Sequence, residues 1–461
     1  MAMVPKGLMG IYGAFAMMVS TLGVIADLVR RLSVFFGWLG DKIPGRRTPF
    51  LLGVTVLGLS TLCFALGSTL PVLLIARVLE GLSSSIVCTL GYALLNDVVG
   101  TAEIGKATGY TDMALSLGIL LGPVAGGFLY EYGGYFQVFL PAIGLLAVEL
   151  VLRLMIIEPE KPGSFAAISP ESSKSRNSLT MADGHTYGTT GTVPAWSDLM
   201  DEYRPAELDP GSASKLVTNI ETQPLLPMTN PQAPGNAFAI MLSEPRFLVA
   251  IMGIFTLLTI GTGFDGVLAP YIKDDFDLNP IHAAGLFLAM ALPMMLAPIS
   301  GILTDRYGPK WPAFSGFLLA VPSLVLLRLV TRGVTLPFVK LAVLLFCFGI
   351  ALALSLPPLR VEAIMVVKAF EEERPGVFGQ NGAYSQAYGL LNLASAAGST
   401  IGPLCAGMVR VWLGWRSMSL SMGLLSAVML VFVIVVTGRS GRRCGQAASD
   451  SSDNCTEVNT H

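Results

Sequence analysis

Long apolar runs, separated by short polar stretches, fill most of this chain. They lie near 8–26, 49–68, 72–97, 107–130, 135–157, 246–270, 282–304, 311–331, 337–366, 378–408 and 416–437. A helix needs about 20 mostly apolar residues to cross a bilayer, and hydrocarbon tolerates only segments that satisfy their own backbone hydrogen bonds. The pattern therefore predicts an all-α polytopic membrane protein with about eleven spanning helices.

Two polar stretches interrupt the apolar runs. Residues 158–243 are rich in Ser, Pro, Thr and Asn and have no sustained apolar period, and residues 439–461 form a second polar stretch. Such composition is typical of disordered segments. We predict a helical bundle over 1–157, a disordered cytoplasmic linker over 158–243, a second bundle over 244–438 and a cytoplasmic tail over 439–461. The linker contains Glu221-Thr-Gln-Pro-Leu225-Leu226, either an acidic dileucine sorting signal or a chance match.

The composition supports a membrane location. Hydrophobic residues make up 53% of the chain and charged residues 13%, whereas soluble chains carry roughly 25% charged residues. The net charge of −2 gives no reason to expect nucleic acid as a partner. Of the six cysteines, Cys63, Cys88, Cys347 and Cys405 lie inside apolar runs, and none has metal-ligand spacing. We therefore expect no metal and no cofactor, with the lipid bilayer as the main partner.

A loop motif occurs twice, which indicates an internal repeat. The first copy holds Gly37, Asp41, Lys42, Arg46 and Arg47, and the second holds Gly301, Asp305 and Arg306. The glycine permits close helix approach, and the aspartate can cap the N-terminus of a neighbouring helix. We expect Asp97 to pair with one of the two arginines of the first copy. A positively charged loop without a further role is the alternative.

A Gly-Pro element follows later in each half. The first holds Gly118, Gly122, Pro123, Gly126 and Gly127, and the second holds Gly398, Gly402, Pro403 and Gly407. Glycines at four-residue spacing share one helix face and permit tight packing. Proline removes a backbone hydrogen bond and favours a bend. The element is either a moving part or a packing seam, and the repeat as a whole is typical of secondary transporters.

Ionisable residues inside the spans are the candidate functional residues, because each is costly in lipid and such residues face cavities. Asp265 lies mid-span in Gly263-Phe-Asp-Gly-Val-Leu-Ala-Pro270. Arg77 could pair with Glu80, and Glu149 with Arg153, either as structural ion pairs or as part of transport. Arg360 and Glu362 are expected near the inner interface, and Asp112 at the interfacial start of its span. These residues are the candidate proton and substrate sites: Asp265, Arg77, Glu80, Glu149 and Glu362.

Basic residues give an orientation. With both Gly-x-x-x-Asp loops on the cytoplasmic side, the short inner connections hold more Lys and Arg than the outer ones. Only one predicted span precedes the first loop, however, whereas the second half has two before its loop. Asp27, Arg30 and Arg31 also interrupt the apolar character just after residue 26. We therefore hypothesise that this chain lacks one N-terminal helix, as a wrong gene model would.

The motifs together resemble the major facilitator superfamily. Ala76-Arg77-Val-Leu-Glu80-Gly81 is similar to that family's Arg-x-x-Gln-Gly element, with Glu80 in place of Gln, and Gly118–Gly127 is similar to its antiporter element. Phe264-Asp265-Gly-Val-Leu-Ala-Pro270 and Pro358-Leu-Arg-Val-Glu362 resemble fungal members of the drug–proton antiporter and vesicular-amine-transporter-like branch. The resemblance implies twelve spans, two pseudo-symmetric six-helix bundles, alternating access and no enzymatic activity. The first loop motif departs from the family by one extra residue at Ile43-Pro44, and the family's first span has no counterpart here.

Three functions compete on this basis. The first is a monomeric, proton-coupled exporter of amphipathic or cationic small molecules, with Asp265 as the proton carrier. The second is an uptake symporter or facilitator for a sugar or organic acid, which the antiporter element disfavours. The third is a non-transporting or decayed membrane protein with eleven spans. The dileucine-like sequence favours the vacuolar membrane, and the resemblance also allows the plasma membrane.

Overall fold

The chain folds into α-helices joined by short connections. The computed structural model describes residues 30–43, 47–67, 69–100, 102–155, 237–276, 280–330, 336–378 and 382–437. These residues contain helices and turns, with no strand among them. The all-α prediction is therefore confirmed for the described part of the chain. We call residues 30–155 the N-half and residues 237–437 the C-half.

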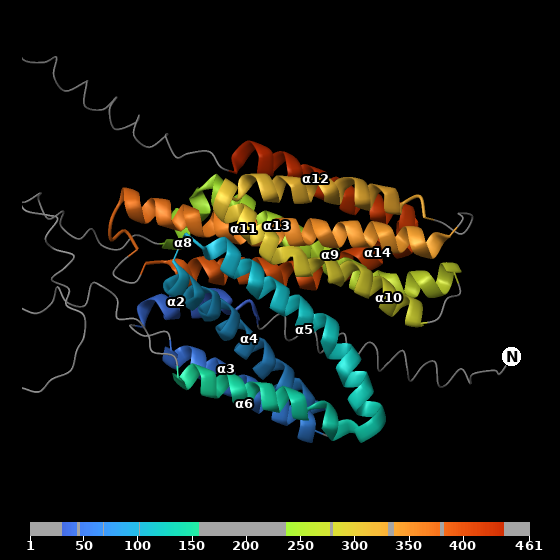
Figure 1. Cartoon of the computed structure of the whole chain (residues 1–461), viewed down its shortest axis with the longest axis horizontal. Helices are drawn as coiled ribbons and strands as arrows, with labels where there is room; N and C mark the ends of the chain where they lie inside the picture. The colour runs from blue at the N-terminus through green and yellow to red at the C-terminus, as the bar shows by residue number, and fades with distance from the viewer. Residues whose placement is uncertain are drawn as a thin grey trace, which may run out of the picture. The chain divides into compact units, whose positions relative to one another are not determined.

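The N-half begins with a short helix that ends at the first loop motif. Its elements are α2 (Ser33–Lys42), α3 (Arg47–Leu66), α4 (Leu70–Val99), α5 (Ile104–Gly133), the 3₁₀ helix η1 (Tyr135–Val138) and α6 (Leu140–Met155) (Figure 1). Gly100 and Gly134 end α4 and α5 with φ of 73° and 78°, a backbone conformation that residues with a Cβ rarely adopt. Glycine thus permits the turns that follow α4 and α5.

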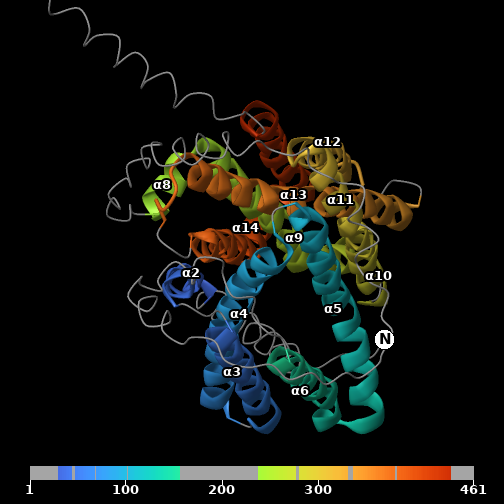
Figure 2. The same ribbon diagram turned by 60° about the vertical axis from the view of Figure 1, so that its left-hand side comes forward.

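The C-half contains the longer helices. Its elements are α8 (Ala237–Ser243), α9 (Pro245–Phe276), α10 (Pro280–Ala291), the 3₁₀ helix η5 (Leu292–Leu296), α11 (Ala297–Tyr307), α12 (Lys310–Leu327), α13 (Pro337–Glu373) and α14 (Tyr384–Val436). Figure 2 shows α9, α13 and α14 side by side in this half. The element α14 consists of two consecutive helices, because Gly414 within it has a non-helical φ of 81° and ψ of 172°. The break falls at Gly414, whereas α14 continues as a helix through Pro403.

Helix length and apolar content make the chain a polytopic membrane protein. Among the described residues, 8 helices are long and apolar enough to cross a membrane, with α14 counted as a single one. Ten of the predicted apolar runs coincide with α3 to α6 and α9 to α14. The run at 8–26 lies outside the described residues, so the predicted number of spans and the absent first helix stay predictions.

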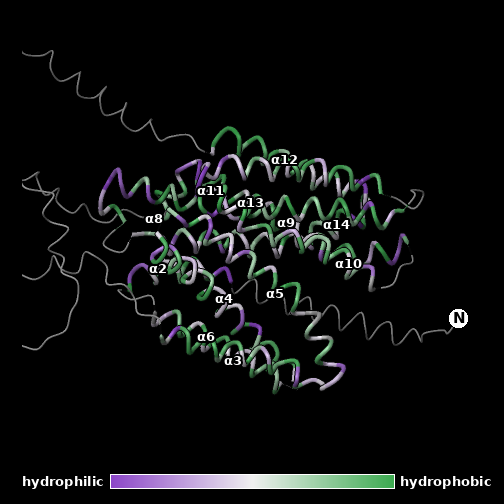
Figure 3. Tube along the Cα trace, viewed as in Figure 1, coloured by the Kyte–Doolittle hydropathy of each residue, from purple (hydrophilic) through white to green (hydrophobic). Residues whose placement is uncertain are grey.

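Apolar side chains divide into a packed interior and a lipid-facing surface. In the C-half, Phe264, Phe317 and Phe348 are fully buried. Val411 and Trp412 are 79% and 76% exposed, values that lipid rather than water accommodates for such side chains. Figure 3 shows apolar residues along most of each helix, with polar residues gathered mainly toward helix ends and connections. This is the distribution that a bilayer solvent selects.

The last residues of the predicted linker form a helix. Residues 158–236 lie outside the described part, but 237–243 form α8 (Ala237–Ser243) rather than a continuation of the linker. Met241 is fully buried in the C-half core, so the apolar sequence Ala-Phe-Ala-Ile-Met-Leu packs instead of remaining in solvent. Helical structure therefore begins before residue 244, and the limits of the linker stay a prediction.

Candidate transport machinery

Asp41 of the first loop motif caps a helix of the other half. Its carboxylate accepts hydrogen bonds from the backbone N–H groups of Ser385 at 3.1 Å and Gln386 at 2.9 Å, in the first turn of α14. Asp41 is only 7% exposed. The helix N-terminus carries partial positive charge and unpaired N–H groups, which a buried carboxylate satisfies. The capping expected of this residue therefore joins the N-half to the C-half.

Asp305 of the second loop motif makes the equivalent contact from the C-half to the N-half. Its two carboxylate oxygens accept hydrogen bonds from the N–H groups of Gly105 at 2.8 Å and Lys106 at 2.7 Å, in the first turn of α5. Each half thus caps one helix of the other half. We call the end of the molecule that holds Asp41, Asp305 and the starts of α5 and α14 the capped end.

Glycines bring the helices of the two halves into backbone contact there. A Cβ built on Gly301 would lie 2.1 Å from the carbonyl oxygen of Gly105, and one on Gly37 would lie 2.5 Å from that of Ser385. Real Cβ atoms do not approach so closely, so both positions require glycine. The Ser33 hydroxyl also donates to the Gly389 carbonyl at 2.9 Å. The halves are therefore closely packed at the capped end.

A buried ion pair crosses the same junction further inside the molecule. The Arg360 guanidinium on α13 donates to the Asp112 carboxylate on α5, with side-chain exposures of 11% and 2%. The Tyr92 hydroxyl donates to the same carboxylate oxygen at 3.0 Å, and the Tyr92 ring stacks on Tyr388 with centroids 5.4 Å apart. We call Tyr92, Asp112, Arg360 and Tyr388 the junction cluster.

Both charged residues of the junction cluster are buried between helices. Asp112 lies two turns inside α5 and is almost fully buried, and its predicted place at the membrane interface stays a prediction. Arg360 is likewise buried between helices, and its predicted depth near the inner interface stays a prediction. Each residue satisfies the other's charge, which lets both enter an apolar environment. The sequence offered a charged residue in each span but no sign that the two would meet.

Asp265 lies in the second half of α9 with an exposed side chain. Its neighbours Gly263 and Gly266 face α14, where a Cβ on Gly266 would lie 2.9 Å from Pro403. The helix α9 remains continuous through Pro270, so the predicted weakening leaves no break. Asp265 is thus a carboxylate on the surface of an apolar span, held in place by a tightly packed helix.

Glu362, the other acidic candidate of the C-half, is part of a buried ion pair. Arg246 at the start of α9 donates to its carboxylate at 2.8 Å, and the side chain of Glu362 is only 1% exposed. Both residues belong to the C-half. The geometry favours a structural tie between α9 and α13 over a role in transport. Sequence reasoning missed Arg246, although an acid buried in a span requires a partner of this kind.

Replacing Glu362 with glutamine is expected to lower the free energy of unfolding by about 3–5 kcal/mol, because Arg246 would keep a buried, unpaired charge. Thermal unfolding of the detergent-purified protein measures the loss. The matched control is Asp274→Asn, which removes an ion pair whose aspartate is 64% exposed. That change should cost no more than about 1 kcal/mol. Equal losses in both variants would contradict a buried structural tie.

The two predicted i-to-i+3 and i-to-i+4 pairs both form. Arg77 contacts Glu80 at 2.7 Å, and Arg153 contacts Glu149 at 3.8 Å. All four side chains are between 26% and 40% exposed. Neither pair bridges the two halves. Their surroundings fit local helix pairs, and a role in transport stays a prediction.

The two Gly-Pro elements differ in packing. In α14, a Cβ on Gly402 would lie 2.4 Å from the Thr259 carbonyl oxygen of α9, so the second seam is tightly packed. In α5, a Cβ on Gly118 or Gly122 would meet no described atom within 4 Å, and one on Gly126 would meet only Val138 at 3.7 Å. The tight packing expected of the first seam is therefore not seen in the described part of the chain. The predicted roles of Pro123 and Gly127 in a bend stay predictions.

The remaining loop residues are placed only in part. Arg46 lies outside the described residues, so its predicted pairing with Asp97 stays untested. Arg47 begins α3, and Lys42 ends α2 with its ammonium 4.0 Å from the centre of the Trp38 ring. Arg306 stands one residue beyond Asp305 with its guanidinium 5.4 Å from the centre of the Tyr307 ring. No group of His, Cys, Asp and Glu suited to a metal ion occurs among the described residues.

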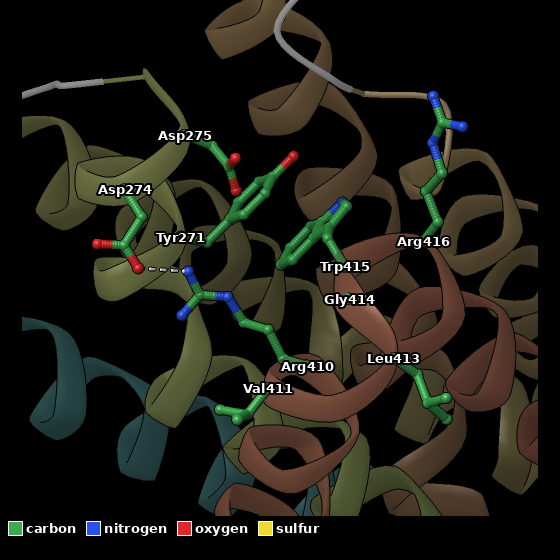
Figure 4. A pocket seen from close by; sticks show the side chains of 9 residues that line it. All are labelled: Tyr271, Asp274, Asp275, Arg410, Val411, Leu413, Gly414, Trp415 and Arg416. Atoms are coloured by element: carbon green, nitrogen blue, oxygen red, sulfur yellow. Dashed lines mark hydrogen bonds and ion pairs between the residues drawn. The ribbon is translucent and has the colours of Figure 1, made fainter.

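A pocket of about 650 Å³ lies at the opposite end of the C-half, where α9 ends and α14 breaks. Tyr271 and Trp415 stack face to face at 3.6 Å, and Arg410 donates to Asp274 at 2.8 Å (Figure 4). The Trp415 indole also donates to the Leu327 carbonyl, and the Tyr271 hydroxyl to that of Val330. Both rings are thus fixed by the fold. The lining does not include Asp265, so this pocket is separate from the mid-span candidate.

Comparison with known proteins adds family and fold. A family profile described as Major Facilitator Superfamily matches residues 1–379 and 296–449. The MFS-type transporter ppzB of Metarhizium rileyi is 31% identical over 423 residues, which cover 88% of this chain and 84% of that protein. The chromaffin granule amine transporter of Rattus norvegicus is 34% identical over 289 residues, covering 59% of this chain and 51% of that protein. The human organic anion transporter MFSD10 (TETRAN) matches in fold, with a TM-score of 0.59 at 18% identity over 90% of this chain and 82% of that one.

Proposed function

Because the chain belongs to the major facilitator superfamily, we propose that it exports small amphipathic or cationic molecules in exchange for protons. Membership makes it a secondary transporter rather than an enzyme. Substrate class and proton coupling are the proposal. The observation that carries it is Asp265, an exposed carboxylate within the second half of an apolar span. A group so costly in lipid is typical of ion and substrate pathways.

A carboxylate suits both parts of this task. When ionised, it attracts a cationic substrate, and when protonated, it releases that substrate and becomes neutral. Competition of proton and cation for one acid is a direct means of exchange, because each ligand displaces the other. Similarity to a protein named as an amine transporter supports the cationic class, and the packed Gly402–Pro403 seam against α9 supports a bundle that moves as a unit.

We further propose that the capped end faces the cytoplasm. Lys42, Arg306 and Lys310 lie at the helix ends there, in keeping with the excess of basic residues on the cytoplasmic side. The tight contacts between the halves at the capped end would then close the protein to the cytoplasm. Opening of this end, with closure of the other, would complete an alternating-access cycle.

Purified protein in liposomes with an imposed pH gradient tests the function. We expect a radiolabelled aromatic amine to move against its gradient when protons move the opposite way, and a protonophore to abolish this movement. Neutral sugars and organic acid anions, tested in parallel, should not accumulate. Accumulation of a sugar or an organic acid together with protons would favour the uptake symporter. If no compound moves, the result would favour the decayed eleven-span protein.

The domain limits and the membrane remain part of the proposal. The linker and tail would lie in the cytoplasm, where the dileucine-like segment at Glu221–Leu226 could direct the protein to the vacuolar membrane in place of the plasma membrane. We expect a monomer, since each half of the family fold packs on the other half of the same chain. Localisation of the tagged protein with and without Leu225→Ala and Leu226→Ala separates the two membranes.

A further inference from the structure

The junction cluster joins the two halves by charge, which distinguishes it from the other buried ion pair. Asp112 belongs to α5 of the N-half and Arg360 to α13 of the C-half, 248 positions apart in the chain. Arg246 and Glu362 are buried to a similar degree, but both lie in the C-half. A movement of one half against the other must therefore separate Asp112 from Arg360 and can leave Arg246 with Glu362 intact.

Burial makes the Asp112–Arg360 contact an all-or-none interaction. With side chains 2% and 11% exposed, little of either charged side chain is accessible while the halves are together. Separation is tolerable only if water enters as the capped end opens, because a lone buried charge is strongly unfavourable. The pair thus has two acceptable arrangements: both partners together in a dry junction, or both apart in a wet one.

Among the described residues, the Asp112 carboxylate bonds through one oxygen only. Arg360 and Tyr92 both bond to Oδ1, whereas the buried Oδ2 has no hydrogen-bond partner among the described residues. A carboxylate oxygen without a partner in a dry junction is costly, and water that enters on opening would satisfy it. The Tyr92 ring of α4 lies 5.3 Å from the Arg360 guanidinium and stacks on Tyr388 of α14.

We propose that Asp112 and Arg360 form a latch that holds the capped end closed and must open once in each transport cycle. The proposal rests on the alternating-access function above and goes beyond the two helix caps, which do not require a second charged side chain. Without the latch, the closed arrangement retains a stranded charge and loses population to the arrangement open at the capped end.

Cys88 offers a native reporter of that opening. It lies on α4 one turn before Tyr92, is half-buried, and is one of the six cysteines. In a background with the other five replaced by serine, the rate at which a polar maleimide labels Cys88 in detergent reports water entry at the junction. We expect Asp112→Asn to raise that rate at least tenfold.

The controls separate a latch from general loosening. Arg246→Gln breaks the buried pair within the C-half and should leave the labelling rate within about twofold of the parent, since it does not cross the junction. The double variant Asp112→Asn with Arg360→Gln, which strands no charge, should label more slowly than Asp112→Asn alone. Each variant is compared only as a monodisperse peak. If Asp112→Asn does not fold, Arg360→Lys, which keeps the charge with poorer geometry, should label faster than the parent.

Two outcomes would overturn the latch. One is labelling at the parent rate in Asp112→Asn, or in Arg360→Lys where that variant replaces it, and the other is equal acceleration by Arg246→Gln. Because labelling needs no substrate, failure of the latch is distinguishable from failure of the proposed function. An unchanged rate with intact amine export would remove the latch alone, whereas faster labelling in a protein that exports no amine would remove the substrate class and leave the latch standing.

Discussion

Asp265→Asn is expected to abolish proton-driven export while the protein still inserts and purifies as a single species. Asparagine has nearly the same size as aspartate but can neither bind and release a proton nor attract a cation by charge. The neutral side chain is also less costly in a span than a carboxylate, so folding should not suffer. We expect the rate of uphill amine movement to fall by about a hundredfold, near the upper end of typical coupling energies of 1–3 kcal/mol.

The measurement is initial amine flux into liposomes at a fixed pH gradient, with Asp265→Glu and Glu131→Gln beside Asp265→Asn. Glutamate keeps the titratable group at a slightly different position and should retain part of the flux. Glu131 is an exposed acid near the end of α5, where removal of its charge should change little. Wild-type flux in Asp265→Asn would mean that another group couples protons to transport, and the exporter would need a different carrier.

The spans could be predicted because lipid imposes a simple rule on the sequence. Any segment that crosses hydrocarbon must be long, apolar and internally hydrogen-bonded, so α3 to α6 and α9 to α14 follow from composition. Helix ends were less certain. The helix α13 continues to Glu373, past the predicted end at 366, because a helix can leave the bilayer without a break once its residues become polar.

The loop motifs were also predictable, and for a different reason. A glycine followed four residues later by aspartate combines close approach with a capping group, and its recurrence in each half pointed to a shared contact. Asp41 and Asp305 make that contact. The sequence did not indicate that each motif would cap a helix of the opposite half, because this depends on how the two bundles are arranged.

The junction cluster and the Arg246–Glu362 pair could not be predicted for the same reason. A charge in a span signals that a partner exists but not which one, and the candidate partners are more than 100 positions apart in the chain. The pairs suggested by the sequence, Arg77–Glu80 and Glu149–Arg153, are those within reach along one helix. Spacing along the sequence predicts ion pairs within one helix. Ion pairs between helices can be identified only once the arrangement of the helices is known.

Gly301→Leu is expected to disfavour closure of the capped end strongly. The Cβ would lie 2.1 Å from the carbonyl oxygen of Gly105 and 3.0 Å from the Cα of Lys106, and backbone atoms cannot rotate away as a side chain can. The helices α5 and α11 would have to move apart, which also pulls Asp305 away from the N–H groups that it caps. Overpacking costs typically about 1–3 kcal/mol, so the closed arrangement should lose up to roughly a hundredfold in population.

Labelling of Cys88 and amine flux together test this prediction, with Gly144→Leu as the matched control. Gly144 lies on the exposed face of α6, where a Cβ would meet no described atom within 4 Å, so the added leucine should face lipid and leave both measurements unchanged. In Gly301→Leu, Cys88 should label faster and export should fall strongly, because the return to the state closed at the capped end is disfavoured. A protein that labels slowly and still exports would show that α5 and α11 need not touch, and closure at the capped end would then require another explanation.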